Sequence, residues 1–201
     1  MKGIVFDFGG VITLAQDGSL YRYLEERLGW SYEMVRAGWK KYRRLMDADK
    51  ISIEELYLRM ASDLNQPLSM EEAIEIGQRD YDSWAYGNPE TIAWMKDLSK
   101  QGYRVGILTN MPSNYVPWFN RAAAEARAIA HAEVISGFEH LAKPQPEIYR
   151  LMEQRMGLAP ENLFFFDDIL ENVEGAKNCG WKGALFTTVD AAKKDLEAIR
   201  F

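Results

Sequence analysis

Short apolar runs alternate with longer stretches of helical periodicity along most of the chain. The apolar runs are rich in Ile, Val, Leu and Phe and do not alternate with polar residues, a pattern typical of strands covered on both faces. This succession of strand and helix predicts an α/β fold with a parallel sheet. The predicted strands are Gly3–Phe8, Arg104–Thr109, Glu133–Ser136, Leu163–Phe166 and Gly183–Thr187. The predicted helices around them are Pro89–Gln101, Pro146–Met156, Glu171–Asn178 and Ala191–Ile199.

The segment between the first two strands, residues 14–87, has no convincing strand pattern and predicts four amphipathic helices. These are Leu20–Leu28, Tyr32–Met46, Ser52–Leu64 and Ser69–Trp84, and the last two begin with the capping signature S-x-x-E. The fold class is therefore predicted to be α/β. We expect a doubly wound parallel-sheet core domain of residues 1–13 and 88–201, and a small four-helix-bundle domain of residues 14–87.

Composition and charge narrow the class of protein. Of the 201 residues, 47% are hydrophobic and 27% are charged, which is typical of a globular protein in water. The net charge of −6 argues against a nucleic-acid partner, since binding to phosphate backbones needs clustered Lys and Arg. The single cysteine, Cys179, excludes an internal disulfide and is typical of a reducing compartment. The first apolar run is too short for a signal peptide or membrane anchor, so a cytoplasmic protein without a membrane partner is expected.

Polar residues stand where the predicted strands end or where a helix is about to begin. In an open parallel sheet, ligands bind at the carboxyl ends of the strands. Taken alone, an Asp-Gly or Thr-Asn pair is equally typical of a turn or a helix cap. Two adjacent carboxylates after three phenylalanines are harder to explain, because their repulsion calls for a cation. In chain order these residues are Asp7, Thr109 with Asn110, Lys143, and Asp167 with Asp168.

In their order and spacing these residues resemble the four motifs of the haloacid dehalogenase-like (HAD) superfamily. The resemblance runs from Lys2 to about Phe186 and rests on the strings FDFGGVI, GILTN, AKPQPEIY and FFFDDILENVEGAKNCGW. These strings are similar to the phosphatase subgroup that includes sugar-phosphate phosphatases and the phosphatase domain of soluble epoxide hydrolases. The resemblance implies a Mg²⁺-dependent phosphatase of a small-molecule phosphomonoester, such as a sugar phosphate, with residues 14–87 as a helical cap.

The resemblance also implies roles for the acidic residues. Asp7 corresponds to the nucleophile that attacks phosphorus and becomes an aspartyl-phosphate. Asp7, the backbone carbonyl of Gly9 and Asp168 correspond to the ligands of Mg²⁺, which prefers oxygen ligands. Asp167 corresponds to a supporting residue that acts on the metal through water or from behind its ligands.

The remaining motif residues correspond to groups that bind the phosphate. Thr109 and Asn110 would bind the phosphoryl oxygens, and Lys143 would neutralise the charge shared by the nucleophile and the phosphate. Gly10 belongs to a turn whose N–H groups are expected to cradle the phosphate. Asn172 is expected to support Lys143 or a water molecule on the metal.

One position departs from the family pattern. Many phosphatases of the superfamily carry a second aspartate two residues after the nucleophile, as the acid and base, and this chain has Gly9 there. General acid–base catalysis contributes about 10²–10⁴-fold to a rate. Two hypotheses follow. The substrate has a leaving group that needs little protonation, such as an anomeric sugar phosphate or an aryl phosphate, or the cap supplies the acid, with Asp17 as the candidate.

Two alternative functions stay open from the sequence. The 2-haloacid dehalogenases of the superfamily also lack the second aspartate, but they need no metal and carry a cap arginine, for which Arg22, Arg27 and Arg36 are candidates. The acidic pair at Asp167 and Asp168 favours a metal and hence phosphate transfer. The second alternative is a weakly catalytic domain that binds a phosphorylated ligand and has a regulatory function. The sequence leaves the substrate and the choice between monomer and homodimer undecided.

Overall fold

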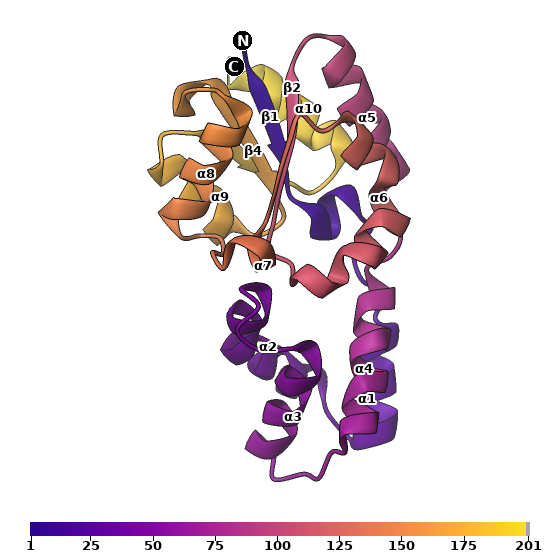
Figure 1. The fold of residues 1–201 in the computed structure, drawn as a ribbon. Coiled ribbons are helices and arrows are strands. Elements are labelled where there is room, and N and C mark those ends of the chain that lie inside the picture. The colour runs from indigo at the N-terminus through magenta and orange to yellow at the C-terminus, as the bar shows by residue number, and fades with distance from the viewer. Residues whose placement is uncertain (200–201) are drawn as a thin grey trace.

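The computed structural model describes residues 1–199, and its centre is a five-stranded sheet in which the described strand pairs are parallel (Figure 1). The strands are β1 (Gly3–Phe6), β2 (Arg104–Thr109), β3 (Ala132–Ile135), β4 (Leu163–Asp167) and β5 (Lys182–Leu185). Their order in the sheet is β3-β2-β1-β4-β5, so that β1 lies at the centre, between β2 and β4. The α/β class and the parallel sheet predicted from the apolar runs are confirmed.

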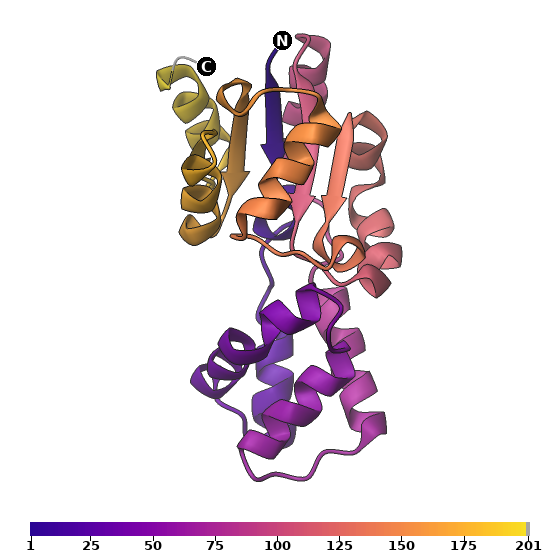
Figure 2. The ribbon, with the colours of Figure 1, turned by 60° about the vertical axis from the view of Figure 1, so that its left-hand side comes forward.

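Helices cover both faces of the sheet (Figure 2). One face carries α5 (Pro89–Lys100), α6 (Val116–Ile129) and α10 (Val189–Ala198), and the other carries α8 (Pro146–Met156) and α9 (Leu170–Asn178). Short helical turns complete the core: η1 (Phe8–Ile12), η2 (Ser113–Tyr115), α7 (Ser136–Glu139) and η3 (Pro160–Asn162). Because strand side chains alternate, Phe164 and Phe166 pack in one buried cluster and Phe165 in the other. This explains why β4 is apolar from Leu163 to Phe166, before Asp167 at its end.

Two differences from the predicted elements have identifiable causes. The first strand ends at Phe6 rather than Phe8, because the following glycines allow the chain to coil into η1, where Gly10 has a φ of +71°. Helix α6 was missing from the predicted helices. Pro117 in its first turn and the alanines that follow are signals that favour it, but Ala123 departs from helical geometry and interrupts its regularity.

The segment between β1 and β2 contains four helices, which lie together beyond the carboxyl edge of the sheet (Figures 1 and 2). They are α1 (Ser19–Leu28), α2 (Tyr32–Asp47), α3 (Ile53–Asp63) and α4 (Met70–Ser83), and residues 14–87 are called the helical insertion below. Ser69 and Glu72 form the complete capping box that the sequence predicted. At α3 the Ser52 side chain accepts from the N–H of Glu55, whose carboxylate pairs with Arg59 instead of completing the box.

The two chain segments that connect the helical insertion to the sheet pair with each other. Thr13 and Gly87 form an antiparallel bridge, and the N–H of Leu14 donates to the carbonyl of Tyr86 over 2.8 Å. This pairing lies at the predicted boundary between residues 13 and 14 and between 87 and 88, although the division into two domains stays a prediction. Within residues 1–199, no helix is both long enough and apolar enough to span a lipid bilayer.

Contacts with two parts of the core hold the helical insertion against the sheet edge. At η2 the N–H of Ser113 donates to Asp49 over 2.9 Å, and the hydroxyl of Tyr81 donates to Asn114 over 2.7 Å. At α9 Arg44 forms an exposed ion pair with Glu171 over 2.6 Å. The helical insertion therefore covers the carboxyl edge of the sheet, where the candidate site residues end their strands.

We expect Gly87→Ala to destabilise the pairing between the two connecting segments. A Cβ at Gly87 would lie 2.2 Å from the carbonyl oxygen of Ala122, and backbone of this kind cannot move aside as a flexible side chain does. The expected loss is about 2 kcal/mol or more in the free energy of unfolding, measured by urea denaturation. Gly102→Ala is the control, because Gly102 faces open space and its φ of +91° adds left-handed strain alone. A Gly87→Ala variant more stable than Gly102→Ala would contradict the clash.

Candidate active site

Three strands bring polar residues to one edge of the sheet. Asp7 follows β1, Thr109 is the last residue of β2, and Asp167 is the last residue of β4, with Asp168 directly after it. Strands that run parallel end at the same edge, so these side chains converge. The N–H of Asp7 donates to the carbonyl of Phe166 over 2.8 Å, which holds the end of β1 against β4.

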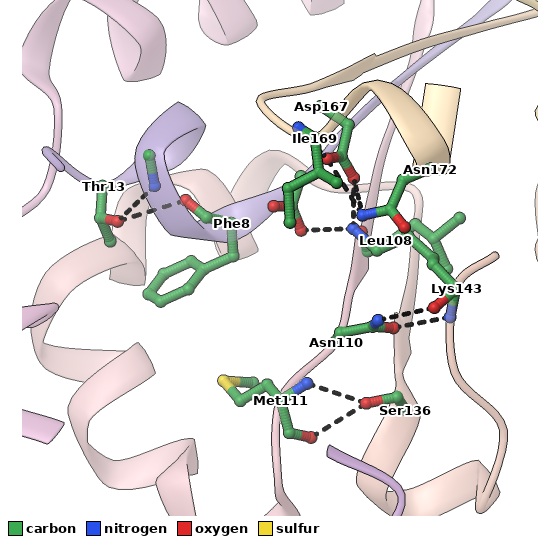
Figure 3. Close-up of polar contacts among 12 residues, drawn as sticks. Phe8, Thr13, Leu108, Asn110, Met111, Ser136, Lys143, Asp167, Ile169 and Asn172 are labelled. Atoms are coloured by element: carbon green, nitrogen blue, oxygen red, sulfur yellow. Dashed lines mark hydrogen bonds and ion pairs between the residues drawn. The ribbon is translucent and has the colours of Figure 1, made fainter. Parts of the chain in front are cut away.

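Lys143 lies at the centre of this edge and is 2% exposed. Its Nζ donates to Asp7 Oδ1 and to Asp167 Oδ2, each over 2.6 Å, and to the carbonyl of Leu108 over 3.0 Å (Figure 3). These three bonds use all three ammonium protons. Burial disfavours the charged form, but the carboxylates of Asp167 and Asp7 outweigh it and raise the pKa of Lys143. The ammonium is therefore charged and fixed in direction.

Asn110 holds the backbone of Lys143 in place (Figure 3). Its Oδ1 accepts from the Lys143 N–H over 2.7 Å, and its Nδ2 donates to the Lys143 carbonyl over 3.0 Å. The sequence predicted that Asn110 binds phosphoryl oxygens. In the structure both polar atoms of its side chain have a partner 33 residues away, a contact with no signal in the sequence, and the phosphate contact through the second Nδ2 proton stays a prediction.

Asp167 is fully buried and surrounded by donors. Besides Lys143, it accepts from the N–H of Ile169 over 2.8 Å and from Asn172 Nδ2, which lies 3.1 Å from both carboxylate oxygens (Figure 3). The hydroxyl of the buried Tyr149 donates to the Asn172 carbonyl over 2.7 Å. Both oxygens of Asp167 thus have partners within the protein. This geometry suits the supporting roles predicted for Asp167 and Asn172, with Tyr149 behind them.

Three carboxylates gather at this edge and form a set that fits a divalent cation. Asp7, Asp167 and Asp168 each offer an oxygen within 4.8 Å of the others. Burial, together with the neighbouring carboxylates and against the effect of Lys143, raises the pKa of Asp7 to about 7. Burial and Asp167 raise the pKa of Asp168 to about 6, although Asp168 stands at the solvent side. A hard cation such as Mg²⁺ would offset the repulsion among the carboxylates, which contributes to both shifts after burial.

The turn after Asp7 is shaped by glycine. A Cβ at Gly10 would lie 2.7 Å from Asp168 Oδ2, and the φ of Gly10 is +71°, so only glycine fits there. The N–H of Gly10 donates to Thr13 Oγ1 over 3.2 Å, and the Thr13 hydroxyl donates to the Phe8 carbonyl over 3.3 Å (Figure 3). The N–H of Gly10, which was predicted to bind phosphate, therefore already has a partner within the protein. The contact of the Gly9 carbonyl with a metal stays a prediction.

A cavity of about 490 Å³ separates the sheet edge from the helical insertion. Its floor includes the side chains predicted from the motifs: Asp7, Thr109, Asn110, Lys143, Asp168 and Asn172. Its roof comes from helices α2 and α4 and their ends: Arg36, Trp39, Arg43, Met46, Asp47, Asp80, Tyr81 and Trp84. The helical insertion thus supplies a roof of aromatic and charged residues. Which of its residues face the floor had no signal in the sequence.

The roof residues Arg43, Asp47 and Asp80 have partners within the helical insertion. Arg43 Nε donates to Asp47 Oδ1 over 2.9 Å, and the Arg43 guanidinium lies over the ring of Trp39 at 5.4 Å. Asp80 is buried and accepts from the hydroxyl of Tyr57 over 2.8 Å and from Gln16 over 3.2 Å. Burial raises the pKa of Asp80, against the lowering effects of Arg43 and the Tyr57 hydrogen bond.

Asp17, the acid suggested from the sequence, lies elsewhere. It is exposed and accepts from the N–H of Ser19 over 2.8 Å, and its hydrogen bonds with Ser19 lower its pKa. Among the described residues, those lining the cavity do not include Asp17. Of the three arginines considered for a dehalogenase, Arg36 lines the cavity, whereas Arg22 and Arg27 are absent from the described lining.

Comparison with known proteins gives the geometry a family context. Phosphatase MT3486 of Mycobacterium tuberculosis is 25% identical over an aligned length of 211 residues, gaps included. The alignment covers 99% of this chain and 95% of that protein. The HAD family enzyme BT-2542 of Bacteroides thetaiotaomicron, in complex with magnesium and inorganic phosphate, has a TM-score of 0.72 at 16% identity, covering 94% of this chain and 96% of that one. The L-2-haloacid dehalogenase of Xanthobacter autotrophicus has a TM-score of 0.71 at 19% identity, covering 98% and 83%.

These two structures share the fold of this chain. Because both are less than 25% identical to it, the likeness shows the fold alone. The family model described as haloacid dehalogenase-like hydrolase matches residues 1–180, which include the predicted motif residues and the helical insertion. The chain therefore belongs to the haloacid dehalogenase-like hydrolase family.

Proposed function

We propose that the protein is a Mg²⁺-dependent phosphatase that hydrolyses a small-molecule phosphomonoester through an aspartyl-phosphate on Asp7. The observation that carries this proposal is the meeting of three carboxylates, Asp7, Asp167 and Asp168, around the buried ammonium of Lys143. A dehalogenase that works without a metal has no use for this concentration of negative charge. The phosphatase name of the relative that matches nearly the whole chain supports the same reading.

The residues at the sheet edge divide the work of the first step. Asp7 Oδ forms a bond to phosphorus as the bond between phosphorus and the leaving oxygen breaks, with the electron pair departing on that oxygen. Lys143 holds Asp7 through a 2.6 Å bond and neutralises charge on the phosphoryl group. Thr109 lines the same cavity as Asp7, and its hydroxyl would donate to a phosphoryl oxygen. Asp7, Asp168 and the Gly9 carbonyl would hold Mg²⁺, which would supply positive charge beside the phosphoryl group.

The second step returns Asp7 to its starting form. A water molecule attacks phosphorus, the bond from phosphorus to Asp7 breaks, and both protons of the water leave with the product as dihydrogen phosphate. Lys143 stabilises the carboxylate that is released, because its Nζ already donates to Asp7 in the resting structure. Asp167 and Asn172 keep this ammonium in place throughout.

A dehalogenase is the second candidate, and one observation favours it. Arg36 lines the cavity roof, where it would meet the carboxylate of a 2-haloacid, and Gly9 stands where a phosphatase usually has its acid. The carboxylate cluster opposes this candidate, since a free carboxylate substrate would add another negative charge beside Asp7 and Asp168. The two candidates therefore differ in whether they require a metal.

Asp7→Asn is expected to abolish phosphate release from small phosphoesters, because an amide oxygen is a poor nucleophile and a weaker metal ligand. Phosphate release by the wild type should require Mg²⁺ and should stop on addition of EDTA. Asp17→Asn is the matched control, since Asp17 is exposed and bonded to Ser19, and it should keep full activity.

Release that persists in Asp7→Asn would contradict the proposed nucleophile. Metal-independent chloride release from 2-chloropropionate would instead establish the dehalogenase. Tight binding of inorganic phosphate, with neither reaction and no phosphorylated Asp7, would identify a binding domain.

Lys143→Met is expected to reduce both activity and stability. It leaves Asp7 and Asp167 facing each other without the ammonium between them, and breaking a buried ion pair from one side costs about 3–5 kcal/mol. The free energy of unfolding in EDTA measures this loss, and phosphate release should fall at least about 100-fold. Lys177→Met is the control: its exposed pair with Glu174 contributes less than about 1 kcal/mol. Equal stability of Lys143→Met and Lys177→Met would show that the ammonium of Lys143 does not balance the charges of Asp7 and Asp167.

A further inference from the structure

Trp84 stands against the position from which the family's second aspartate would extend. A Cβ built at Gly9 would lie 3.4 Å from Cζ3 of the indole, 3.7 Å from Cε3 and 3.9 Å from Cη2. Those are contacts with the six-membered ring, so a longer side chain at position 9 would have to displace it or turn aside. Trp84 and Gly9 line the same cavity as Asp7, 75 residues apart in the chain. The space left by the missing acid is thus bordered by an aromatic ring.

Hydrogen bonds fix the end of α4, from which this ring extends. Trp84 is the C-cap residue of α4, and the preceding turn carries Asp80, which Tyr57 and Gln16 hold by hydrogen bonds of 2.8 and 3.2 Å. Gln16 also donates to Ser83 Oγ over 2.7 Å, directly before Trp84. These bonds tie the end of α4 to the chain that leaves the sheet. The Trp84 side chain is partly buried against the hydrophobic core and extends over Gly9 from this fixed backbone.

Other rings extend the aromatic part of the cavity wall. Tyr81, one turn before the end of α4, packs edge to face on Tyr115 with ring centroids 4.9 Å apart, and both line the cavity. Trp39 contributes a further ring from α2. A leaving group directed away from Asp7 and toward the roof would enter a space with flat apolar surfaces. Such surfaces favour a planar leaving group over a branched or fully hydrated one.

The described carboxylates of this wall already have partners. Asp47 accepts from Arg43 through Oδ1, and Asp80 accepts from Tyr57 and Gln16. To act as an acid, either one would first have to be protonated, which weakens the ion pair of Asp47 with Arg43 or the hydrogen bonds that Asp80 accepts. A leaving group that departs unprotonated must itself be a stable anion. Planarity and anion stability together describe the oxygen of a phenol or of an enol.

We propose that Trp84 takes the place of the missing acid as an aromatic contact for the leaving group, and that the substrates are aryl or enol phosphates. This inference rests on the proposed phosphatase function and adds the class of substrate. In the first step the bond from Asp7 to phosphorus forms, the bond to the aryl or enol oxygen breaks, and the oxygen leaves as an aryloxide or enolate. It takes a proton from the dihydrogen phosphate formed in the second step, or from solvent, after it has left.

Four substrates separate the ring from the acidity of the leaving group. The leaving group of 4-nitrophenyl phosphate is acidic and has a ring, whereas that of acetyl phosphate is acidic and has no ring. The leaving group of benzyl phosphate has a ring and is weakly acidic. The leaving group of glycerol 3-phosphate is weakly acidic and has no ring. The wild type should hydrolyse the two esters with acidic leaving groups at least about 100-fold faster, measured as kcat/KM. Trp84→Ala should lower kcat/KM about tenfold for 4-nitrophenyl phosphate and leave acetyl phosphate nearly unchanged. Tyr86→Ala, an exposed aromatic residue two positions further, is the control.

Each outcome of this panel has a defined meaning. Comparable rates for benzyl and 4-nitrophenyl phosphate would overturn the inference, because an acid would then be present elsewhere. Equal losses for acetyl and 4-nitrophenyl phosphate in Trp84→Ala would overturn the ring contact. Turnover of acetyl phosphate also shows that the variant is folded. Failure of the proposed function itself looks different, because no ester, acetyl phosphate included, would then give release that depends on Mg²⁺ and Asp7.

A pair of variants tests the spatial relation of Gly9 and Trp84 directly. Gly9→Asp introduces the family's acid against the indole, and we expect little gain on benzyl phosphate. In Gly9→Asp combined with Trp84→Ala the carboxylate has room, so kcat/KM for benzyl phosphate should rise about tenfold or more above Gly9→Asp alone. A double variant no better than Gly9→Asp, with acetyl phosphate still hydrolysed, would overturn the claim that the ring stands in the place of the acid.

Discussion

The buried ammonium of Lys143 is the interaction on which the rest of the candidate site depends. Its Nζ bonds to Asp7 after β1, to Leu108 in β2 and to Asp167 in β4, so one group joins three adjacent strands at the sheet edge. Taking these charges out of water is expensive, and the cost is offset only when the geometry satisfies every donor and acceptor. Asn110 and the donors around Asp167 meet this condition. Asn110 fixes the backbone of Lys143, and the donors around Asp167 satisfy the remaining lone pairs of that carboxylate.

The charge balance at this edge also explains why a metal fits. Among the described residues that gather there, one ammonium faces three carboxylates, and a phosphoester would bring further negative charge to the same place. Burial raises the pKa of Asp7 and of Asp168, and the neighbouring carboxylates raise both further. Asp167 has protein partners for both oxygens, whereas Asp168 stands at the solvent side. The geometry therefore distinguishes Asp167, which holds the lysine, from the more exposed Asp168, whose contact with a cation stays a prediction.

How much the sequence could predict follows from the range of each interaction. Asp7, Thr109 and Asp167 were predictable as neighbours, because parallel strands end at one edge whatever the side chains around them do. The helices of the insertion were predictable from periodicity and capping signals. The partner of Asn110 was not, since a hydrogen bond across 33 residues leaves no pattern in either segment. Asp17 was the wrong place to look for a cap residue in the cavity, because which faces of α2 and α4 point inward depends on how the helices pack.

Gly9 is the case in which the sequence poses a question that only packing can answer. The sequence shows that an acid is missing, and the structure shows an indole beside the vacant position. The magnitudes of the two effects decide what this exchange does. A general acid lowers the activation barrier by about 3–5 kcal/mol. An aromatic contact stabilises by only about 0.5–1.5 kcal/mol beyond the area that it buries. For an ester of a weakly acidic alcohol, the contact with Trp84 cannot replace the missing general acid. The acidity of the leaving group therefore selects the substrate first, and the shape of the leaving group selects it second. A ring over Gly9 therefore narrows the reaction to esters that need no acid, on a sheet edge otherwise equipped for phosphoryl transfer.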